Sequence, residues 1–206
     1  MKRIQVDCAL NLGWGCLTCF VLQSLGCRKF GGPFDWVMTR DMVANLGLLG
    51  RSFEDYLSED ITIKMLGSGP CLLDEVNDLA IYHPIHTDDG VNRGVLDMTI
   101  NEVKDIFLKR CKRLREAMDT HESILFVRES PHRTVEDPEF IITALQAMSK
   151  AKIYLLLGYT MEETKKPVDD VYYMDYLNMP TKELRWERMI QGIEQFDVQQ
   201  IGVIET

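Results

Sequence analysis

The 206-residue chain lacks any apolar run approaching the roughly 18–20 residues that cross a bilayer, so we expect no membrane-spanning segment. Its opening residues, MKRIQVDCALNLGWGC, also lack the unbroken apolar core of a secretory signal, because Gln5, Asp7 and Asn11 interrupt it. These absences predict a cytoplasmic protein without a membrane partner.

The chain also has fewer basic than acidic residues: 23 Lys and Arg and 32 Asp and Glu give it a formal net charge of −9. A chain with this balance repels the phosphates of nucleic acids and of anionic lipids, so we expect neither as a partner. The basic run at 109–115 is flanked by acidic residues of the same predicted helix, which favours a solvated helix face over a binding patch.

Two ligand signatures are incomplete. Gly13 and Gly15 would begin a dinucleotide-binding turn, but Thr18 stands where its third glycine belongs. Cys16 and Cys19 form one C-x-x-C pair, and without a second pair they make a poor zinc site. We therefore expect no cofactor and no metal. A single C-x-x-C at a predicted helix start leaves thiol redox chemistry open as an alternative.

Apolar periodicity predicts helices and strands that alternate along the chain. Helices are expected over 16–25, 41–49, 99–119, 138–150 and 181–196. Strands are expected over 4–10, 79–86, 123–127, 153–157, 171–176 and 198–204, whereas residues 51–78 show no sustained period and are predicted to be irregular. Strands separated by helices of this length imply crossover connections. We predict one α/β domain over residues 1–206, a three-layer sandwich around a mainly parallel sheet.

The clearest candidate for chemistry is Cys16, which follows a short strand and the turn Gly13–Gly15 and stands where a helix should begin. Free N–H groups and a partial positive charge at a helix start stabilise an anion, so a cysteine there is expected to have a lowered pKa. The same N–H groups could hold the oxyanion of a tetrahedral intermediate. Burial as a small apolar residue is the commoner fate of a cysteine.

A thiol nucleophile needs a base, and the chain has four histidines from which to supply it. His86 ends a predicted strand and is followed by Asp88, which could orient its ring. His83 and His132 are alternatives at nearby strand ends, whereas His121 is expected only to end a helix.

Substrate binding is expected at the turn formed by Gly13, Trp14 and Gly15 and at Arg128. Arg128 ends a buried apolar run, and the carboxyl end of a parallel strand faces the crevice where ligands bind. A guanidinium there could hold a carboxylate or phosphate, or could form an ion pair with an acidic neighbour such as Glu129. Without catalysis, the turn and Arg128 would form a binding site for a small anionic ligand.

Several segments resemble the family of putative papain-like cysteine peptidases, a domain of unknown function. The resemblance rests on residues 11–16 (NLGWGC), 22–30 (LQSLGCRKF), 32–36 (GPFDW) and 124–128 (ILFVR), and more loosely on 85–88 (IHTD). It implies Cys16 as nucleophile, a histidine as base and Asp35 as a candidate orienting or structural carboxylate. The family label also implies a papain-like α+β fold, which is the alternative to the α/β sandwich.

Together these observations predict a cysteine-nucleophile hydrolase, a peptidase or amidase that acts on a peptide or a small amide or acyl substrate. Transfer of the acyl group to an amine instead of water would use the same residues. The sequence does not indicate the oligomeric state.

Overall fold

The computed structural model describes residues 3–39, 41–66, 69–82, 85–86, 92–130, 137–159, 167–176, 179 and 181–199. The helices of this part are α1 (Cys16–Ser24), α2 (Met42–Gly50), α3 (Ile100–Thr120), α4 (Pro138–Ala147) and α5 (Lys182–Ile193), with a 3₁₀ turn at Val95–Asp97. The strands are β1 (Ile4–Val6), β2 (Cys8–Asn11), β3 (Val37–Thr39), β4 (Thr62–Leu66), β5 (Gly69–Asp74), β6 (Leu79–Ile81), β7 (Ile85–His86), β8 (Asn92–Arg93), β9 (Ser123–Ser130), β10 (Lys152–Tyr159), β11 (Val171–Asp175) and β12 (Phe196–Val198).

A four-stranded parallel sheet with the order β11-β10-β9-β2 forms the centre of the fold. In its register, Phe126 of β9 lies between Leu10 of β2 and Leu155 of β10. β1 pairs in parallel with β12, which joins the two ends of the described chain. The prediction of an α/β fold with parallel strands is confirmed.

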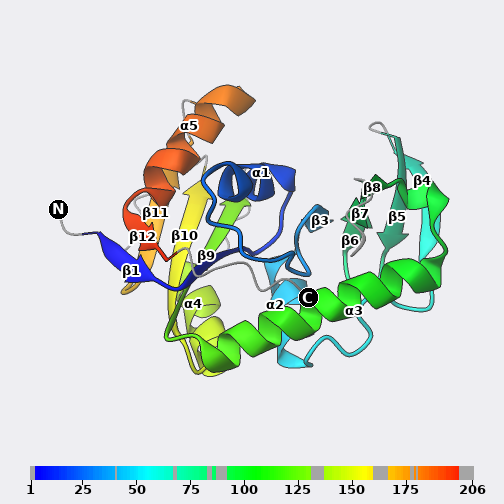
Figure 1. Ribbon diagram of the computed structural model, residues 1–206, viewed down its shortest axis with the longest axis horizontal. Helices are drawn as coiled ribbons and strands as arrows, with labels where there is room; N and C mark the ends of the chain where they lie inside the picture. The colour runs from blue at the N-terminus through cyan, green and yellow to red at the C-terminus, as the bar shows by residue number, and fades with distance from the viewer. Residues whose placement is uncertain are drawn as a thin grey trace.

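Side chains of β9 alternate between two apolar clusters on opposite faces of this sheet. Ile124 and Phe126 pack with residues of α3 and α4, whereas Leu125 and Val127 pack with residues of α1 and α5. Figure 1 shows α1 and α5 on one side of the sheet and α3 and α4 on the other. Each such buried aliphatic side chain contributes roughly 1.5–3 kcal/mol, and burial on both faces explains the apolar runs 124–127 of β9 and 153–157 of β10.

A second, antiparallel sheet has the strand order β3-β6-β5-β4. The prediction that residues 51–78 are irregular is therefore wrong, because β4 and β5 both lie in this segment. β4 is the last strand in that order and its residues 62–65 are all exposed, so the short alternation of Ile63 and Met65 with polar residues does not mark a buried face. α3, with 21 residues, extends from the parallel sheet past the antiparallel one (Figure 1).

Two predicted strands are divided in the structure. The strand expected over 4–10 breaks at Asp7, whose carboxylate accepts hydrogen bonds from the backbone of Glu122 at 2.7 Å and Ser123 at 3.0 Å. The strand expected over 79–86 is represented by β6 and β7. The last strand begins at Phe196 rather than Val198, and residues 200–204 of the prediction lie outside the described residues. Within the described part, no helix combines the length and apolar character needed to traverse a bilayer.

Candidate functional site

Cys16 is the first residue of α1, as the sequence predicts. Before each of the other α-helices stands a residue whose side chain accepts a hydrogen bond from a backbone N–H of the first turn. These residues are Asp41 for α2, Thr99 for α3, Asp137 for α4 and Thr181 for α5. Gly15 precedes α1 at the corresponding position and has no side chain to accept a hydrogen bond, and the first turn of α1 contains no acidic residue. The free N–H groups at the start of α1, beside Cys16, therefore receive no hydrogen-bond acceptor from a capping side chain.

The turn that leads to Cys16 has an unusual backbone. Gly13 and Trp14 follow one another at φ +94° and +84°, and this left-handed region is costly for a tryptophan. The Gly13 N–H donates to Asn11 Oδ1 at 3.1 Å, and the Trp14 N–H donates to Thr39 Oγ1 at 3.2 Å. Both amides are thus engaged inside the protein, which leaves the start of α1 as the source of N–H groups for a ligand.

The predicted turn residues differ in their access to solvent. Gly13 is buried, whereas Trp14, Gly15 and Cys16 are half-buried and reach the surface together. A Cβ placed on Gly15 would meet no atom within 4 Å, so the space beside Cys16 is open. A substrate could approach the thiol from this side.

The prediction of a lowered pKa for Cys16 is wrong for this structure. Burial raises the pKa of the Cys16 thiol from 9.0 to about 11, because the thiolate loses solvation. The positive charge of Lys182 opposes this rise, and the negative charge of Asp35 adds to it. The Lys182 Nζ lies 5.4 Å from the centre of the Phe20 ring, one helical turn after Cys16, which places this lysine beside α1.

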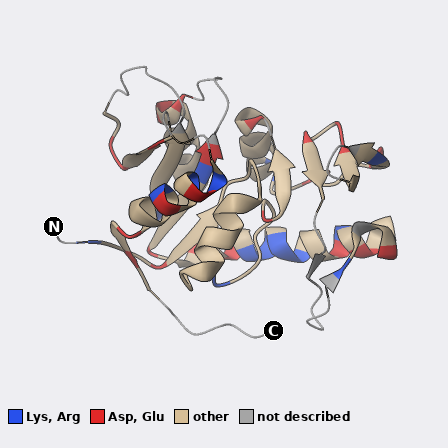
Figure 2. Ribbon diagram, turned by 90° about the horizontal axis from the view of Figure 1, so that it is seen from above, with Lys and Arg blue, Asp and Glu red and all other residues tan. Residues whose placement is uncertain are grey.

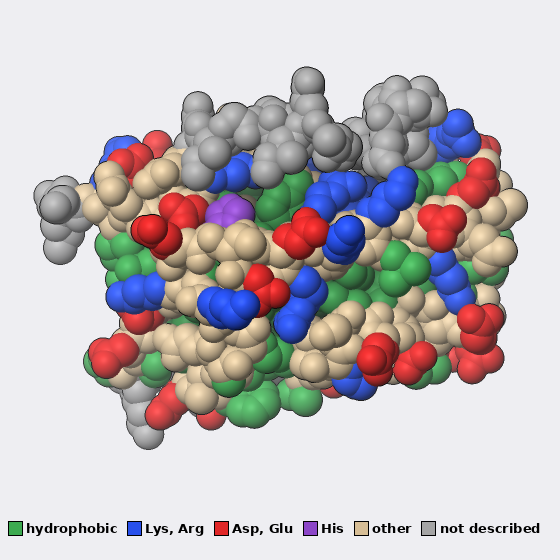
Figure 3. All heavy atoms as spheres, turned by 60° about the horizontal axis from the view of Figure 1, so that its bottom comes forward, with side chains coloured by type: hydrophobic (Ala, Val, Ile, Leu, Met, Phe, Trp, Pro, Cys, Tyr) green, Lys and Arg blue, Asp and Glu red, His purple; other side chains and the backbone are tan. Residues whose placement is uncertain are grey.

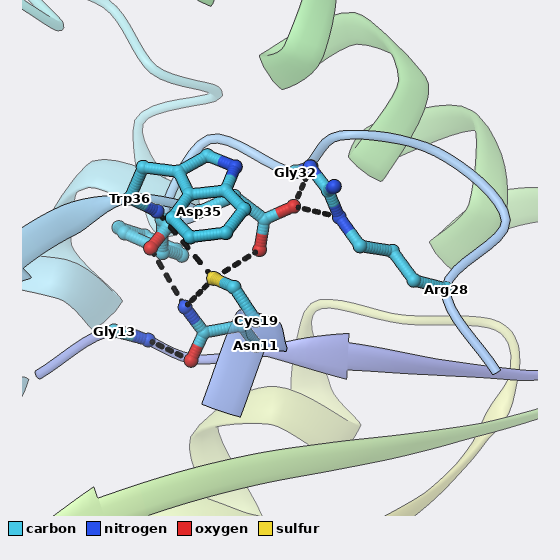
Figure 4. A network of polar contacts seen from close by, with 8 residues as sticks. Asn11, Gly13, Cys19, Arg28, Gly32, Asp35 and Trp36 are labelled. Carbon is cyan, nitrogen blue, oxygen red and sulfur yellow. Dashed lines mark hydrogen bonds and ion pairs between the residues drawn. The ribbon is translucent and has the colours of Figure 1, made fainter. Parts of the chain in front are cut away.

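Asp35 lies in a buried network with Arg28 and Cys19 (Figure 4). One carboxylate oxygen accepts from Arg28 Nε at 2.9 Å and from the Gly32 N–H at 2.8 Å, and the other accepts from Cys19 Sγ at 3.3 Å. Asp35 is only 3% exposed. These contacts fit the structural reading of Asp35, in which the carboxylate anchors the loop 28–36 over α1.

Cys19 connects this network to β2, the strand before the turn that leads to Cys16. Its sulfur accepts from Asn11 Nδ2 at 3.2 Å and from the Trp36 N–H at 3.4 Å (Figure 4). Burial and the charge of Asp35 hold the pKa of Cys19 well above its usual range. All six cysteines are free thiols, and Cys19 is fully buried. This environment is typical of a core thiol.

Arg128 is completely buried near the carboxyl end of β9. Its Nη1 donates to the Leu12 carbonyl at 3.1 Å and to Thr39 Oγ1 at 3.4 Å. Glu129, the acidic neighbour considered above, instead binds Arg185 of α5 at 2.7 Å. Arg128 thus contacts the backbone of the turn that precedes Cys16.

The predicted base cannot be placed against Cys16. The backbone of His86 lies in β7, but its side chain is outside the described residues, as are Asp88 and the alternatives His83 and His132. His121 ends α3, as expected. The roles of His86 and Asp88 stay predictions.

Two residues of the site were not foreseen in their roles. Thr39 Oγ1 accepts a hydrogen bond from the Trp14 amide, while Asp41 caps α2. Asn45 lies inside α2 and donates to Thr39 Oγ1 at 2.8 Å and to the Leu12 carbonyl at 3.3 Å. A buried asparagine on the apolar face of a predicted helix is the one sequence signal that could have indicated this contact.

Charges of both signs are interspersed along α3 and α5 (Figure 2), and the face shown in Figure 3 carries the same mixture. In the basic run of α3, Lys109 and Lys112 are exposed, as a solvated helix face requires. Arg110 is instead buried, with its guanidinium 4.6 Å from the centre of the Phe107 ring. Among the described residues, no group of His, Cys, Asp and Glu has the arrangement of a metal site.

One family model matches residues 8–155, more than two thirds of the chain, and this family is described as "Putative papain-like cysteine peptidase (DUF1796)". Comparisons with curated proteins and with solved structures found no match. The matched span contains Cys16 with its preceding turn, the Asp35 loop and Arg128, and it ends before β11 and α5. The resemblance seen in the sequence is thereby confirmed, and the chain belongs to the family of putative papain-like cysteine peptidases.

Proposed function

We propose that this protein is a cysteine-nucleophile hydrolase that acts on a peptide or on a small amide or acyl substrate through Cys16. The observation that carries the proposal is the position of Cys16 as the first residue of α1, a helix whose N-terminal amides have no capping side chain. The open space beside Gly15 gives a substrate access to both the thiol and these amides.

The reaction follows from this position. The Cys16 sulfur attacks the acyl carbon and forms a C–S bond, while the carbonyl π electrons move to the oxygen. The N–H groups of Cys16 and Leu17 stabilise that oxyanion. Collapse of the intermediate expels the amine or alcohol, which takes up the proton that left the thiol, and water then hydrolyses the thioester to the acid.

The raised pKa of Cys16 bears on the proton transfer. With a pKa of about 11, the thiol is almost entirely neutral at pH 7, so it must lose its proton during attack rather than before it. This requires a base within reach of the sulfur. We assign that role to His86, oriented by Asp88, on the basis of the sequence.

The fold offers a consistent setting for this chemistry. We infer a three-layer α/β arrangement, because helices pack against both faces of the parallel sheet. In such folds, ligands bind beyond the carboxyl ends of the strands, and the turn between β2 and Cys16 begins at one of these ends.

The test is acylation by p-nitrophenyl acetate, followed by release of nitrophenolate and by mass spectrometry of the intact protein. We expect one acetyl group on Cys16 of the native protein and none there in Cys16→Ala. Cys27→Ala is the matched control, because Cys27 is a second half-buried thiol whose pKa is raised by burial.

Acetylation that persists undiminished in Cys16→Ala would refute the proposal. Native protein that is not acylated but binds inorganic phosphate, with Cys16→Ala binding equally well, would favour the non-catalytic anion-binding alternative. A reversible disulfide between Cys16 and Cys19, detected by mass spectrometry, would favour redox chemistry.

A further inference from the structure

Three buried side chains from separate parts of the chain meet behind the turn that leads to Cys16: Thr39 at the end of β3, Asn45 in α2 and Arg128 in β9. We propose that these residues, the turn clamp, are positioning residues that hold the turn so that the N–H groups of α1 are aimed at the oxyanion of the substrate. This inference rests on the proposed function and assigns Arg128 a different task from substrate binding.

The contacts of the turn clamp converge on two backbone groups. The Leu12 carbonyl accepts from Arg128 Nη1 at 3.1 Å and from Asn45 Nδ2 at 3.3 Å. The Trp14 N–H, two residues later, donates to Thr39 Oγ1 at 3.2 Å. The clamp therefore holds the turn on both sides of Gly13.

The clamp is also connected within itself. Thr39 Oγ1 accepts from Asn45 Nδ2 at 2.8 Å and from Arg128 Nη1 at 3.4 Å. All three side chains are 0% exposed, so these hydrogen bonds have no competing solvent and are strengthened by their low-dielectric surroundings. Such a node fixes positions more firmly than surface contacts would.

The backbone itself shows why a clamp is needed. Two consecutive residues at positive φ, one of them Trp14, are unfavourable unless the surrounding structure enforces them. Gly13 also fits tightly, because a Cβ there would collide with Thr39 Oγ1 and approach Asn45 Nδ2 to 2.9 Å. The clamp thus maintains a strained turn immediately before Gly15 and the nucleophile.

Because Arg128 is completely buried, its contacts favour a positioning role over direct substrate binding. Arg128 contacts the Leu12 carbonyl and Thr39 from inside the protein, whereas the open space beside the site lies at Gly15. A substrate that approaches from Gly15 meets the thiol and the amides of α1. Through its described contacts, the guanidinium acts on the turn at the Leu12 carbonyl and at Thr39.

The test compares two reactions of the same thiol. Acylation by p-nitrophenyl acetate generates an oxyanion, whereas alkylation by iodoacetamide is a displacement at a saturated carbon and generates none. We expect Thr39→Val, which lacks the acceptor for the Trp14 N–H, to slow acylation of Cys16 roughly a hundredfold, the loss that follows when a reacting group is displaced by about 1 Å or an oxyanion donor is lost. Alkylation of Cys16 should stay within about twofold, since it depends on the thiol alone.

Two further variants control for the loss of a hydroxyl group. Thr39→Ser keeps the acceptor and should restore most of the acylation rate. Thr18→Val removes another buried hydroxyl, on α1, for which the described contacts include no hydrogen-bond partner, and it should leave both reactions unchanged. Arg128→Lys repeats the test at a second position, because a lysine cannot reproduce the geometry of a guanidinium, and it should give the same selective loss of acylation.

The outcomes are distinct. Acylation of Thr39→Val and Arg128→Lys at the native rate would overturn the clamp while leaving the proposed function intact. Equal losses of acylation and alkylation, with a lower Tm, would show a merely structural role and would also overturn it. A native protein that is not acylated at Cys16 would refute the proposed function, and the positioning role with it.

Discussion

Gly13 provides the sharpest test of the geometry of the turn that precedes Cys16. In Gly13→Ala, the new methyl group would stand at φ +94°, a conformation that costs an alanine about 1–2 kcal/mol. It would also collide with Thr39 Oγ1 and lie 2.9 Å from Asn45 Nδ2 and 3.3 Å from Arg128 Nη1. Displacing these buried groups costs a further ~1–3 kcal/mol in weakened hydrogen bonds. We therefore expect the free energy of unfolding to fall by about 3 kcal/mol.

Gly15→Ala is the matched control, two residues away in the same turn. Gly15 has φ −177°, which any residue adopts, and a Cβ there has no neighbour within 4 Å. Its unfolding free energy should change by less than about 0.5 kcal/mol. Urea unfolding followed by circular dichroism measures both variants, and the midpoint of Gly13→Ala should fall by about 1 M or more. Equal midpoints for the two alanine variants would refute the close packing of the clamp against Gly13.

Three other predictions concern single side chains. Lys182→Gln should raise the midpoint of the pH profile for Cys16 alkylation by about half a pH unit at low salt, whereas Lys182→Arg, which keeps the charge, should not. A profile that is independent of salt and identical in the native protein and both variants would contradict the charge effect. Thr18→Val should raise the free energy of unfolding by about 1 kcal/mol in urea titrations. The buried Thr18 hydroxyl has no hydrogen-bond partner among the described contacts, and valine puts a methyl group of similar size in its place. Burial raises the pKa of Cys8 from 9.0 to about 12, so its neutral thiol stabilises the fold fully below pH 9 and this stability is lost as the pH rises toward 12. Thermal unfolding over that window should show a smaller fall in Tm for Cys8→Ala than for the native protein.

The elements whose residues carry their own signals could be predicted from the sequence. α3 begins at the capping box formed by Thr99 and Glu102, and β9 contains the apolar run 124–127 because these residues are buried on both faces of the sheet. The position of Cys16 at the start of α1 also follows from local pattern, since a short strand and a glycine turn precede a periodic apolar segment. Local sequence is sufficient where the local structure is regular.

The antiparallel sheet and the contacts of Arg128 depend on distant parts of the chain. β4 pairs with β5 while its apolar side chains Ile63 and Met65 are exposed, so burial of these side chains does not stabilise it. Arg128 reaches back 116 residues to the Leu12 carbonyl, a contact that spacing cannot reveal. The pKa of Cys16 likewise depends on burial by the folded chain, which outweighs the effect expected from the helix start.

The pairing of β1 with β12 has a consequence for the order of events during synthesis. Ile4 is opposite Phe196 in this ladder, so the contact has a long sequence separation and the pair can form only after Phe196 has left the ribosome. α5, which supplies Lys182 beside α1, emerges just before β12. A nascent chain therefore carries Cys16 long before it has Lys182, and the surroundings described for this thiol form only after α5 has been synthesised.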